Sequence, residues 1–127
     1  MTESDSNSIL VVDDIEENCD LLELKLKRNG YQVSIANNGQ EALDTLAEKH
    51  IDLLLLDITM PVMDGVDVLK RIKQDEKYSK IPIIMLTAAG EPKTVLKCLR
   101  LGAMGYVTKP SDMDEVLKTI ANCLQES

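Results

Sequence analysis

Hydrophobic residues along this chain follow two patterns that alternate from one end to the other. Short apolar runs, such as Ile-Leu-Val-Val at residues 9–12, are followed by longer segments in which apolar residues recur every three or four positions. The short runs are typical of β-strands and the longer segments of amphipathic α-helices. Strands are predicted at residues 9–12, 31–35, 53–56, 81–86 and 106–108, each followed by a helix that begins near residue 15, 38, 64, 91 or 111.

The predicted strands differ in character. Residues 53–56 and 81–86 are apolar without alternation, as expected for central strands that are covered on both faces. In residues 31–35 the apolar positions alternate with Gln32 and Ser34, which is typical of a half-exposed strand at a sheet edge. Strands and helices in strict alternation predict a three-layer α/β/α sandwich around a parallel sheet. This pattern leaves the order of the strands open.

The predicted helices carry signals at their ends. The first, at residues 15–29, has acidic residues early and basic residues late, which complements the helix dipole, and Gly30 follows it. Asn38 and Glu41 form a capping pattern for the second helix, which is expected to extend to His50. The residues expected on inner helix faces are Ile15, Leu22 and Leu26, then Ala42, Leu43, Leu46 and Ala47, then Val68, Leu69 and Ile72, and finally Val116, Leu117, Ile120 and Leu124.

Composition and charge limit the possible functions. The chain has 127 residues, enough for one domain, and its core must be aliphatic because it contains no Phe or Trp. A net charge of −8 argues against direct binding of nucleic acid or of an anionic membrane, but it is compatible with binding a cation. The three cysteines are an odd number and lie far apart, which disfavours a disulfide framework or a zinc site.

The two ends of the chain differ in composition from the segments between them. Residues 1–7 are polar and acidic and lack the features of a signal peptide. We expect a flexible tail there, ahead of a single domain at residues 8–126. No apolar run approaches the length of a membrane span. The sequence therefore indicates a cytoplasmic protein.

Polar residues follow four of the five predicted strands. In open parallel sheets, ligands bind at the carboxyl ends of the strands. The loops there would bring three carboxylates, a hydroxyl and an ammonium group into one shallow cleft. Clustered carboxylates ionise readily only with a cation between them, and Mg²⁺ is a hard cation that accepts carboxylate ligands. The residues are Asp13 and Asp14 after the first strand, Asp57 after the third, Thr87 and Ala88 after the fourth, and Lys109 and Pro110 after the fifth.

This set of residues suits the transfer of a phosphoryl group. One carboxylate can act as a nucleophile and form an acyl phosphate. Lys109 and the metal would share the charge of the phosphoryl oxygens, while Thr87 Oγ and backbone N–H groups would supply hydrogen bonds. Each residue alone has a simpler interpretation as a helix cap, a turn former or a surface side chain. Their occurrence together at the ends of four strands favours the site.

Four segments carry a resemblance to a known family. They are residues 9–14 (Ile-Leu-Val-Val-Asp-Asp), 55–65 (Leu-Leu-Asp-Ile-Thr-Met-Pro-Val-Met-Asp-Gly), 83–89 (Ile-Ile-Met-Leu-Thr-Ala-Ala) and 102–110 (Gly-Ala-Met-Gly-Tyr-Val-Thr-Lys-Pro). From residue 9 to residue 124 the chain resembles a response-regulator receiver domain. This resemblance implies a flavodoxin-like sheet of five parallel strands in the order 2-1-3-4-5.

The resemblance also implies a metal-dependent phosphorylation site. Asp57 would be the phosphoacceptor. The metal would be Mg²⁺, with Mn²⁺ as a substitute. Asp14 and Asp57 would bind it directly together with the backbone carbonyl of Thr59, and Asp13 would contact it mainly through water.

The remaining implied residues bind the phosphoryl group and report its presence. Lys109 would pair with the phosphoryl group, and the Lys109–Pro110 peptide bond would be cis. Thr87 and Ala88 would contact the phosphoryl group, and Tyr106 would swing inward behind Thr87. The face formed by the fourth helix, the fifth strand and the fifth helix would rearrange and bind a downstream protein.

The expected function is that of a phosphoacceptor signalling switch in a two-component phosphorelay. A histidine kinase or a histidine-phosphotransfer protein would phosphorylate Asp57, without direct contact to nucleic acid and without membrane insertion. The protein would catalyse only its own phosphoryl transfer and dephosphorylation, so it is not expected to be an enzyme in the metabolic sense. It would be either a single-domain regulator or a receiver domain from a larger regulator or hybrid kinase.

Three other classes of function stay open at this point. A phosphatase of the haloacid dehalogenase type would place a second Asp two residues after the nucleophile, where this chain has Thr59. A flavin binder would need hydrogen-bond donors after the first strand, where Asp13 and Asp14 would repel its phosphate. The third class is a docking module that is never phosphorylated, which the complete acidic cluster disfavours.

Overall fold

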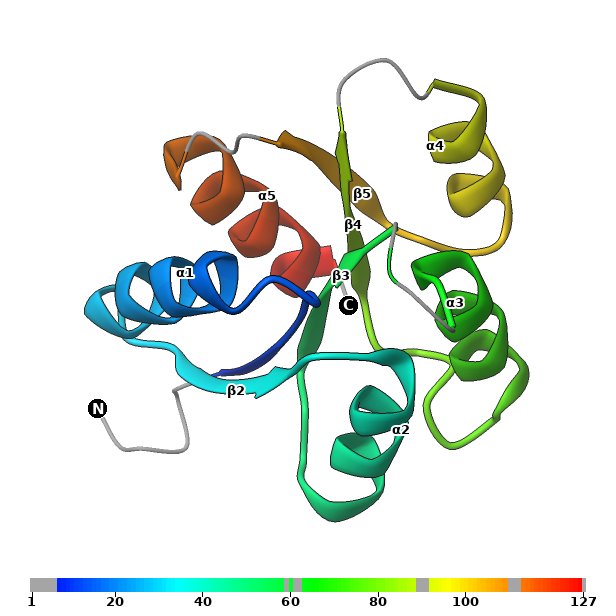
Figure 1. The fold of residues 1–127 in the computed structure, drawn as a ribbon, viewed down its shortest axis with the longest axis horizontal. Helices are drawn as coiled ribbons and strands as arrows, with labels where there is room; N and C mark the ends of the chain where they lie inside the picture. Colours follow the sequence, from blue (N-terminus) through cyan, green and yellow to red (C-terminus); the bar gives the residue numbers. More distant parts are fainter. Residues whose placement is uncertain (1–6, 59, 61–62, 89–91, 110–112, 127) are drawn as a thin grey trace.

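Five parallel strands form a single sheet in the computed structural model, which describes residues 7–58, 60, 63–88, 92–109 and 113–126. The strand order is β2-β1-β3-β4-β5, the order that the resemblance implied. Figure 1 shows the sheet with helices on both sides. The elements are β1 (Ser8–Val12), α1 (Glu16–Arg28), β2 (Gln32–Ala36), α2 (Gly39–Glu48), β3 (Leu53–Asp57), α3 (Gly65–Gln74), β4 (Ile83–Ala88), α4 (Pro92–Arg100), β5 (Gly105–Lys109) and α5 (Met113–Glu126).

The helices divide into two layers. The helices α1 and α5 cover one face of the sheet, and α2, α3 and α4 cover the other (Figure 1). The predicted three-layer α/β/α sandwich is confirmed. The edge position predicted for the strand at residues 31–35 is confirmed too, because β2 pairs only with β1 among the described strands.

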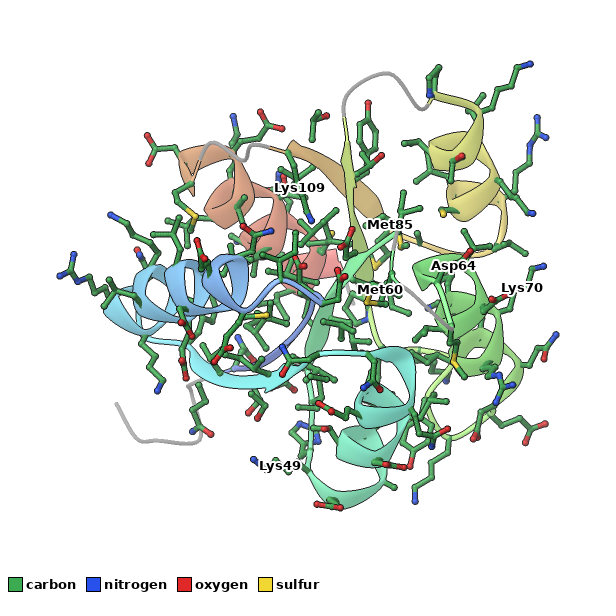
Figure 2. All side chains as sticks on the ribbon, in the orientation of Figure 1. Lys49, Met60, Asp64, Lys70, Met85 and Lys109 are labelled. Atoms are coloured by element: carbon green, nitrogen blue, oxygen red, sulfur yellow. The ribbon has the colours of Figure 1, made fainter. Side chains whose placement is uncertain are left out.

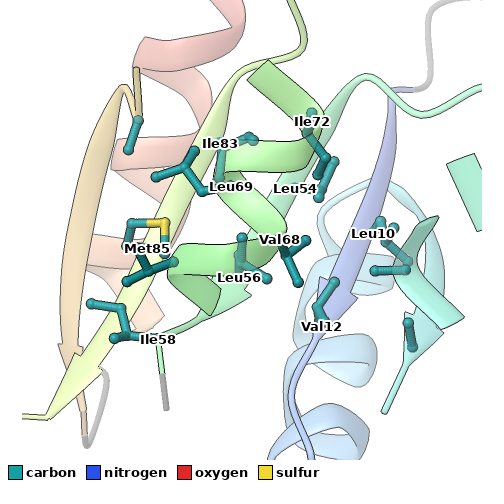
Figure 3. Packing of buried hydrophobic residues seen from close by; sticks show 14 of the residues in the cluster. Leu10, Val12, Leu54, Leu56, Ile58, Val68, Leu69, Ile72, Ile83 and Met85 are labelled. Atoms are coloured by element: carbon teal, nitrogen blue, oxygen red, sulfur yellow. The ribbon is translucent and has the colours of Figure 1, made fainter. Parts of the chain in front are cut away.

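The central strands are apolar throughout because successive side chains enter two different layers. Leu54 and Leu56 of β3 contact the layer of α2 and α3, where Figure 3 shows them beside Val68 and Leu69. Leu53 and Leu55 of β3 pack on the opposite side, in the layer of α1 and α5. The buried side chains of both layers are aliphatic residues, methionine and cysteine. The prediction of an aliphatic core is therefore confirmed.

Helix caps explain where two of the helices begin. Asn38 Oδ1 accepts a hydrogen bond from the Glu41 backbone N–H at 2.9 Å, and Glu41 Oε1 accepts one from the Asn37 N–H at 3.0 Å. Asn38 therefore caps α2 as predicted, and the Glu41 side chain reaches back to the residue before the cap. Asp64 caps α3 by accepting from the Asp67 N–H at 3.0 Å.

Several predicted boundaries shift by one or two residues. The second helix ends at Glu48, before the predicted His50, because Lys49 has an extended backbone conformation. The fourth strand begins at Ile83, since the Ile81 N–H still belongs to a turn and donates to the Tyr78 carbonyl at 3.1 Å. The starts predicted near residues 91 and 111, and residues 1–6 of the predicted tail, lie outside the described residues.

Three predictions about the inner helix faces need correction or addition. Ile15 is half exposed because it precedes α1 as its N-cap residue instead of lying within the helix. Ala47 is exposed and does not face the core. Cys123, which the apolar stripe of the last helix did not include, is buried beside Val116 and Ile120.

Candidate functional site

The predicted site residues meet at the carboxyl edge of the sheet. Asp13 follows β1, Asp57 ends β3, Thr87 lies near the end of β4, and Lys109 ends β5. Strand pairing keeps these ends level, with Asp57 opposite Leu86 and Thr87 opposite Thr108. Asp13, Asp57 and Thr87 are the buried polar or charged residues of the described chain, with 0%, 5% and 2% of their surfaces exposed. Thr59 and Pro110 lie outside the described residues.

Three carboxylates converge here. One oxygen atom from each of Asp13, Asp14 and Asp57 lies within 4.8 Å of the others, with Asp14 exposed to solvent and the other two buried. Buried carboxylates this close together repel one another unless positive charge lies between them. Oxygen donors of this kind fit a hard divalent cation such as Mg²⁺. The cluster can therefore hold a metal, with Asp14 on its open side.

Lys109 supplies positive charge inside the cluster. Its Nζ lies 3.0 Å from Asp13 Oδ2 and 3.2 Å from Asp57 Oδ2. Figure 2 shows this side chain at the end of β5, the strand beside α5. Burial acts to lower the pKa of Lys109, but the hydrogen bond to Asp13 and the charge of Asp57 outweigh it, so the pKa is raised. Lys109 is therefore a cation at neutral pH and links the first and third strands through their carboxylates.

Asp13 is held by more partners than the sequence suggested. Its Oδ1 accepts a hydrogen bond from the Ile15 N–H at 2.9 Å, and its Oδ2 accepts one from Asn18 Nδ2 at 3.3 Å. Its carbonyl oxygen accepts from Asn37 Nδ2 at 3.2 Å and from Cys19 Sγ at 3.3 Å. Sequence reasoning missed Asn18 and Asn37 because both belong to other elements, α1 and the loop after β2.

Cys19 lies beside Asp13 but has an unreactive thiol. Its side chain is fully buried. Burial first, and then the negative charges of Asp13 and Asp20, raise the pKa of the Cys19 thiol to about 11. A thiol with such a pKa stays protonated at neutral pH and is a poor nucleophile. Cys19 therefore acts as a packing residue and a hydrogen-bond donor to Asp13.

Gly65 allows α3 to begin directly against β3, the strand that ends with Asp57. Its N–H donates to the Ile58 carbonyl at 2.7 Å. A Cβ at this position would overlap the Asp57 carbonyl oxygen and lie 2.8 Å from Ile58 Cα. Any residue other than glycine would therefore displace the backbone that carries Asp57. The sequence predicted that Asp64 and Gly65 open a helix, but the contact with Asp57 could not be read from the pattern.

The sequence matches one protein family over almost its whole length. The family model of the response regulator receiver domain matches residues 9–121. The chain belongs to this family. Receiver domains are signalling modules that interact with histidine kinases, and the family generally binds Mg²⁺, in agreement with the acidic cluster of this receiver domain.

Two curated relatives illustrate the similarity. The transcriptional regulatory protein ZraR of Klebsiella oxytoca is 41% identical to this receiver domain over 116 residues, and the regulatory protein AtoC of Escherichia coli (strain K12) is 40% identical over 119 residues. The matches cover 91% and 94% of this chain but 26% and 25% of those proteins. The chain therefore spans about a quarter of the length of these relatives.

Solved structures give the same result. The chemotaxis response regulator CheY4 of Vibrio cholerae superposes with a TM-score of 0.87 at 30% identity, covering 93% of this chain and 98% of that one. The receiver domain of NtrX from Brucella abortus superposes with a TM-score of 0.88 at 28% identity, covering 94% and 99%.

The two predicted switch residues of this receiver domain differ in exposure. Thr87 is buried, whereas Tyr106 of β5 is 48% exposed. Alternation along the strands places both on the sheet face that α4 covers, because Leu86 and Val107 point into the layer of α1 and α5. Tyr106 therefore has an outward orientation, on the side of the sheet where Thr87 lies.

A small hollow adjoins the site on the opposite side of the sheet. Its volume is about 160 Å³. Its walls come from α1 and α5, and its polar floor includes the Lys109 and Asp13 pair. The residues that line this hollow are Asp13, Asn18, Leu21, Leu22, Leu86, Lys109 and Met113.

No helix in the part of the chain that the structure describes has the length and apolar character needed to cross a membrane.

Proposed function

We propose that this receiver domain is a phosphoacceptor switch of a two-component phosphorelay, with Asp57 as the residue that takes the phosphoryl group. The donor would be the phosphohistidine of a histidine kinase or of a histidine-phosphotransfer protein. The observation that carries the proposal is the position of Lys109 Nζ, within 3.2 Å of Asp57 and 3.0 Å of Asp13, beside three carboxylates that lie within 4.8 Å of one another.

In the proposed reaction, one Asp57 carboxylate oxygen attacks the phosphorus atom. An O–P bond forms as the P–N bond of the phosphohistidine breaks, and the bond's electron pair stays on the imidazole nitrogen. Lys109 Nζ balances the negative charge of the phosphoryl oxygens from its place beside Asp57. Asp57 is 5% exposed, which favours attack on a group brought into the site over general reaction with solvent.

Mg²⁺, or Mn²⁺ in its place, would be held directly by Asp14, Asp57 and the Thr59 carbonyl, and through water by Asp13. When bound, it would neutralise charge on the carboxylates and on the transferred group. The assignment of Asp13 to an indirect role is supported by its hydrogen bonds, since both of its carboxylate oxygens already accept from protein donors.

The response to phosphorylation would pass through Thr87 and Ala88 to Tyr106. Thr87 Oγ would donate a hydrogen bond to a phosphoryl oxygen, and Tyr106 would turn inward behind it. The face formed by α4, β5 and α5 would then present a changed surface to a downstream protein. Exposed apolar residues on this face, Leu96, Leu99, Met104 and Tyr106, support that assignment.

The first test is intact-mass spectrometry after incubation with a small-molecule phosphodonor. We expect one added phosphoryl group in the presence of Mg²⁺, none with EDTA, and none in Asp57→Asn. Asp44→Asn, which changes an exposed aspartate on α2, is the matched control and should be labelled like the unmodified protein. Full labelling of Asp57→Asn would refute the assignment of the phosphoacceptor.

A further inference from the structure

The carboxylate of Asp13 is fully buried and shares one of its oxygens between two donors. Oδ1 is fixed by the Ile15 N–H at 2.9 Å. Oδ2 accepts from Lys109 Nζ at 3.0 Å and from Asn18 Nδ2 at 3.3 Å. A buried carboxylate oxygen that loses its donors carries a large desolvation penalty. If Lys109 moves away, the free-energy cost therefore depends on whether another donor still bonds to Asp13 Oδ2.

We infer that Asn18 is a positioning residue, whose side-chain amide holds Asp13 Oδ2 while Lys109 Nζ turns to the phosphoryl group on Asp57. This inference rests on the proposed function. Lys109 Nζ bonds both Asp13 and Asp57 before phosphorylation, and a phosphoryl group on Asp57 competes for it with greater negative charge. Asn18 then keeps one donor on Oδ2 and lowers the cost of releasing Lys109.

The chemistry of the pair requires an amide donor. An ionised carboxylate only accepts hydrogen bonds, so Asn18 must present its NH₂ group to Asp13. Unlike Lys109, this amide is neutral, so it is not drawn toward the phosphoryl group by charge. It is also anchored on a helix, because the Asn18 backbone N–H donates to the Ile15 carbonyl at 3.1 Å in the first turn of α1.

The backbone of Asp13 has its own supports, which separates the proposed role from a general structural one. The Asp13 carbonyl accepts from Asn37 Nδ2 and Cys19 Sγ, and the Asp13 N–H donates to the Ala36 carbonyl at 3.1 Å. We therefore expect the backbone of Asp13 to keep its position when the Asn18 amide is removed. Loss of the amide removes only the second donor to Oδ2.

The test uses Asn18→Leu, which is close in size and lacks the amide. Its matched control is Gln40→Leu, which removes an amide that donates to the Asp44 carboxylate at 3.0 Å on the exposed face of α2. With saturating Mg²⁺, two quantities are measured: the initial rate of phosphoryl labelling and the concentration of beryllofluoride that half-saturates the protein. For Asn18→Leu we expect the initial rate of labelling to fall and the half-saturating concentration of beryllofluoride to rise, each roughly tenfold. A change of this size corresponds to the loss of one hydrogen bond to a charged group. Gln40→Leu should change neither.

A second measurement needs no metal and no phosphoryl group. In a Lys109→Ala background Asn18 is the remaining side-chain donor to Oδ2 among the described residues, so Asn18→Leu should lower the melting temperature more there than in the unmodified protein. A purely structural role for Asn18 predicts equal losses in both backgrounds. If Asn18→Leu fails to fold, the smaller variant Asn18→Ala takes its place in both measurements.

The outcomes separate the two proposals. Unchanged labelling and beryllofluoride affinity in the Asn18 variant would overturn the inference and show that solvent replaces the amide. Equal thermal losses in both backgrounds would overturn it as well. An unmodified protein that takes neither a phosphoryl group nor beryllofluoride would instead overturn the proposed function, whatever the Asn18 variant does.

Discussion

The two helices that flank the site, α1 and α4, differ in how many residues they bury. The helix α1 buries three residues, and Leu26 among them is fully buried. The helix α4 buries one of its nine residues, Cys98, and leaves Leu96 and Leu99 exposed. The helix α1 also exposes Leu21 and Leu24, but its three buried residues fix it to the sheet more firmly than the single buried residue of α4 does.

This difference indicates which side of the site can move. Displacing a helix costs little free energy when it buries few apolar contacts. On the α1 flank, displacement would break the hydrogen bonds that hold Asp13 as well as the packing of the helix. A change at Asp57 is therefore expected to displace α4, while α1 stays in place and keeps the Asp13 carboxylate in its position.

The largest expected effect tests the packing difference directly. Leu26→Ala should lower the free energy of unfolding by about 2–5 kcal/mol because it opens a cavity under α1. Leu96→Ala, at a side chain that is 53% exposed, should change it by about 0.5 kcal/mol or less. Urea unfolding followed by circular dichroism measures both. Similar losses in the two variants would mean that α4 is held as firmly as α1.

The start of α3 is expected to hold the backbone of Asp57 in place. Gly65→Ala forces a Cβ against the Asp57 carbonyl and should cost about 1–3 kcal/mol of stability by overpacking. It should also slow phosphoryl labelling, because the Asp57 backbone must shift. The rate of labelling is measured by intact mass.

Gly30→Ala provides the control for this prediction. Gly30 has a φ of +90°, but a Cβ there would meet no atom within 4 Å. Alanine at this position should cost about 1–2 kcal/mol because of its backbone conformation, and it should leave labelling unchanged. If Gly65→Ala labels at the normal rate, the close approach of α3 does not position Asp57.

The sequence predicted the features that depend on local pattern. Central strands were recognisable from unbroken apolar runs, and the carboxyl ends of the strands identified Asp13, Asp57, Thr87 and Lys109 as neighbours, because a parallel sheet aligns those ends. The capping pattern of Asn38 and Glu41 identified the start of the second helix, and the third helix was predicted to begin near residue 64.

Features that depend on how elements sit together could not be predicted. Leu96 and Leu99 have the spacing of an inner helix face, but their exposure depends on where α4 rests against the sheet. Ile15 fits the apolar pattern of α1 yet lies before the helix, because the Asp13 carboxylate accepts its N–H. The link from Asn18 to Asp13 joins a helix to a strand end, and no periodicity reports such a contact.

The smallest expected effect compares the buried cysteines of the two flanks at alkaline pH. The pKa of the Cys19 thiol is raised from 9.0 to about 11 by burial and by Asp13 and Asp20. Burial and Asp64 raise the pKa of Cys98 as well. A raised pKa in the folded state stabilises the protein below the unfolded pKa, and that contribution is lost as the pH rises through the folded pKa.

Between pH 9.0 and about 11 the unfolded Cys19 ionises while the folded thiol stays protonated, so the native protein loses stability there. Cys19→Ala removes this titration. The difference in the free energy of unfolding between the unmodified protein and Cys19→Ala should therefore become smaller as the pH rises over that range. Cys98→Ala should show a smaller decrease in this difference, since Cys98 lacks the neighbouring Asp13. Urea midpoints at roughly pH 8 and pH 10.5 measure the difference, and the window lies above the range where carboxylates titrate. If the stability differences of the two variants decrease equally with pH, the charge of Asp13 does not affect the Cys19 thiol. The two helices would then differ in their buried packing more than in the electrostatics of their cysteines.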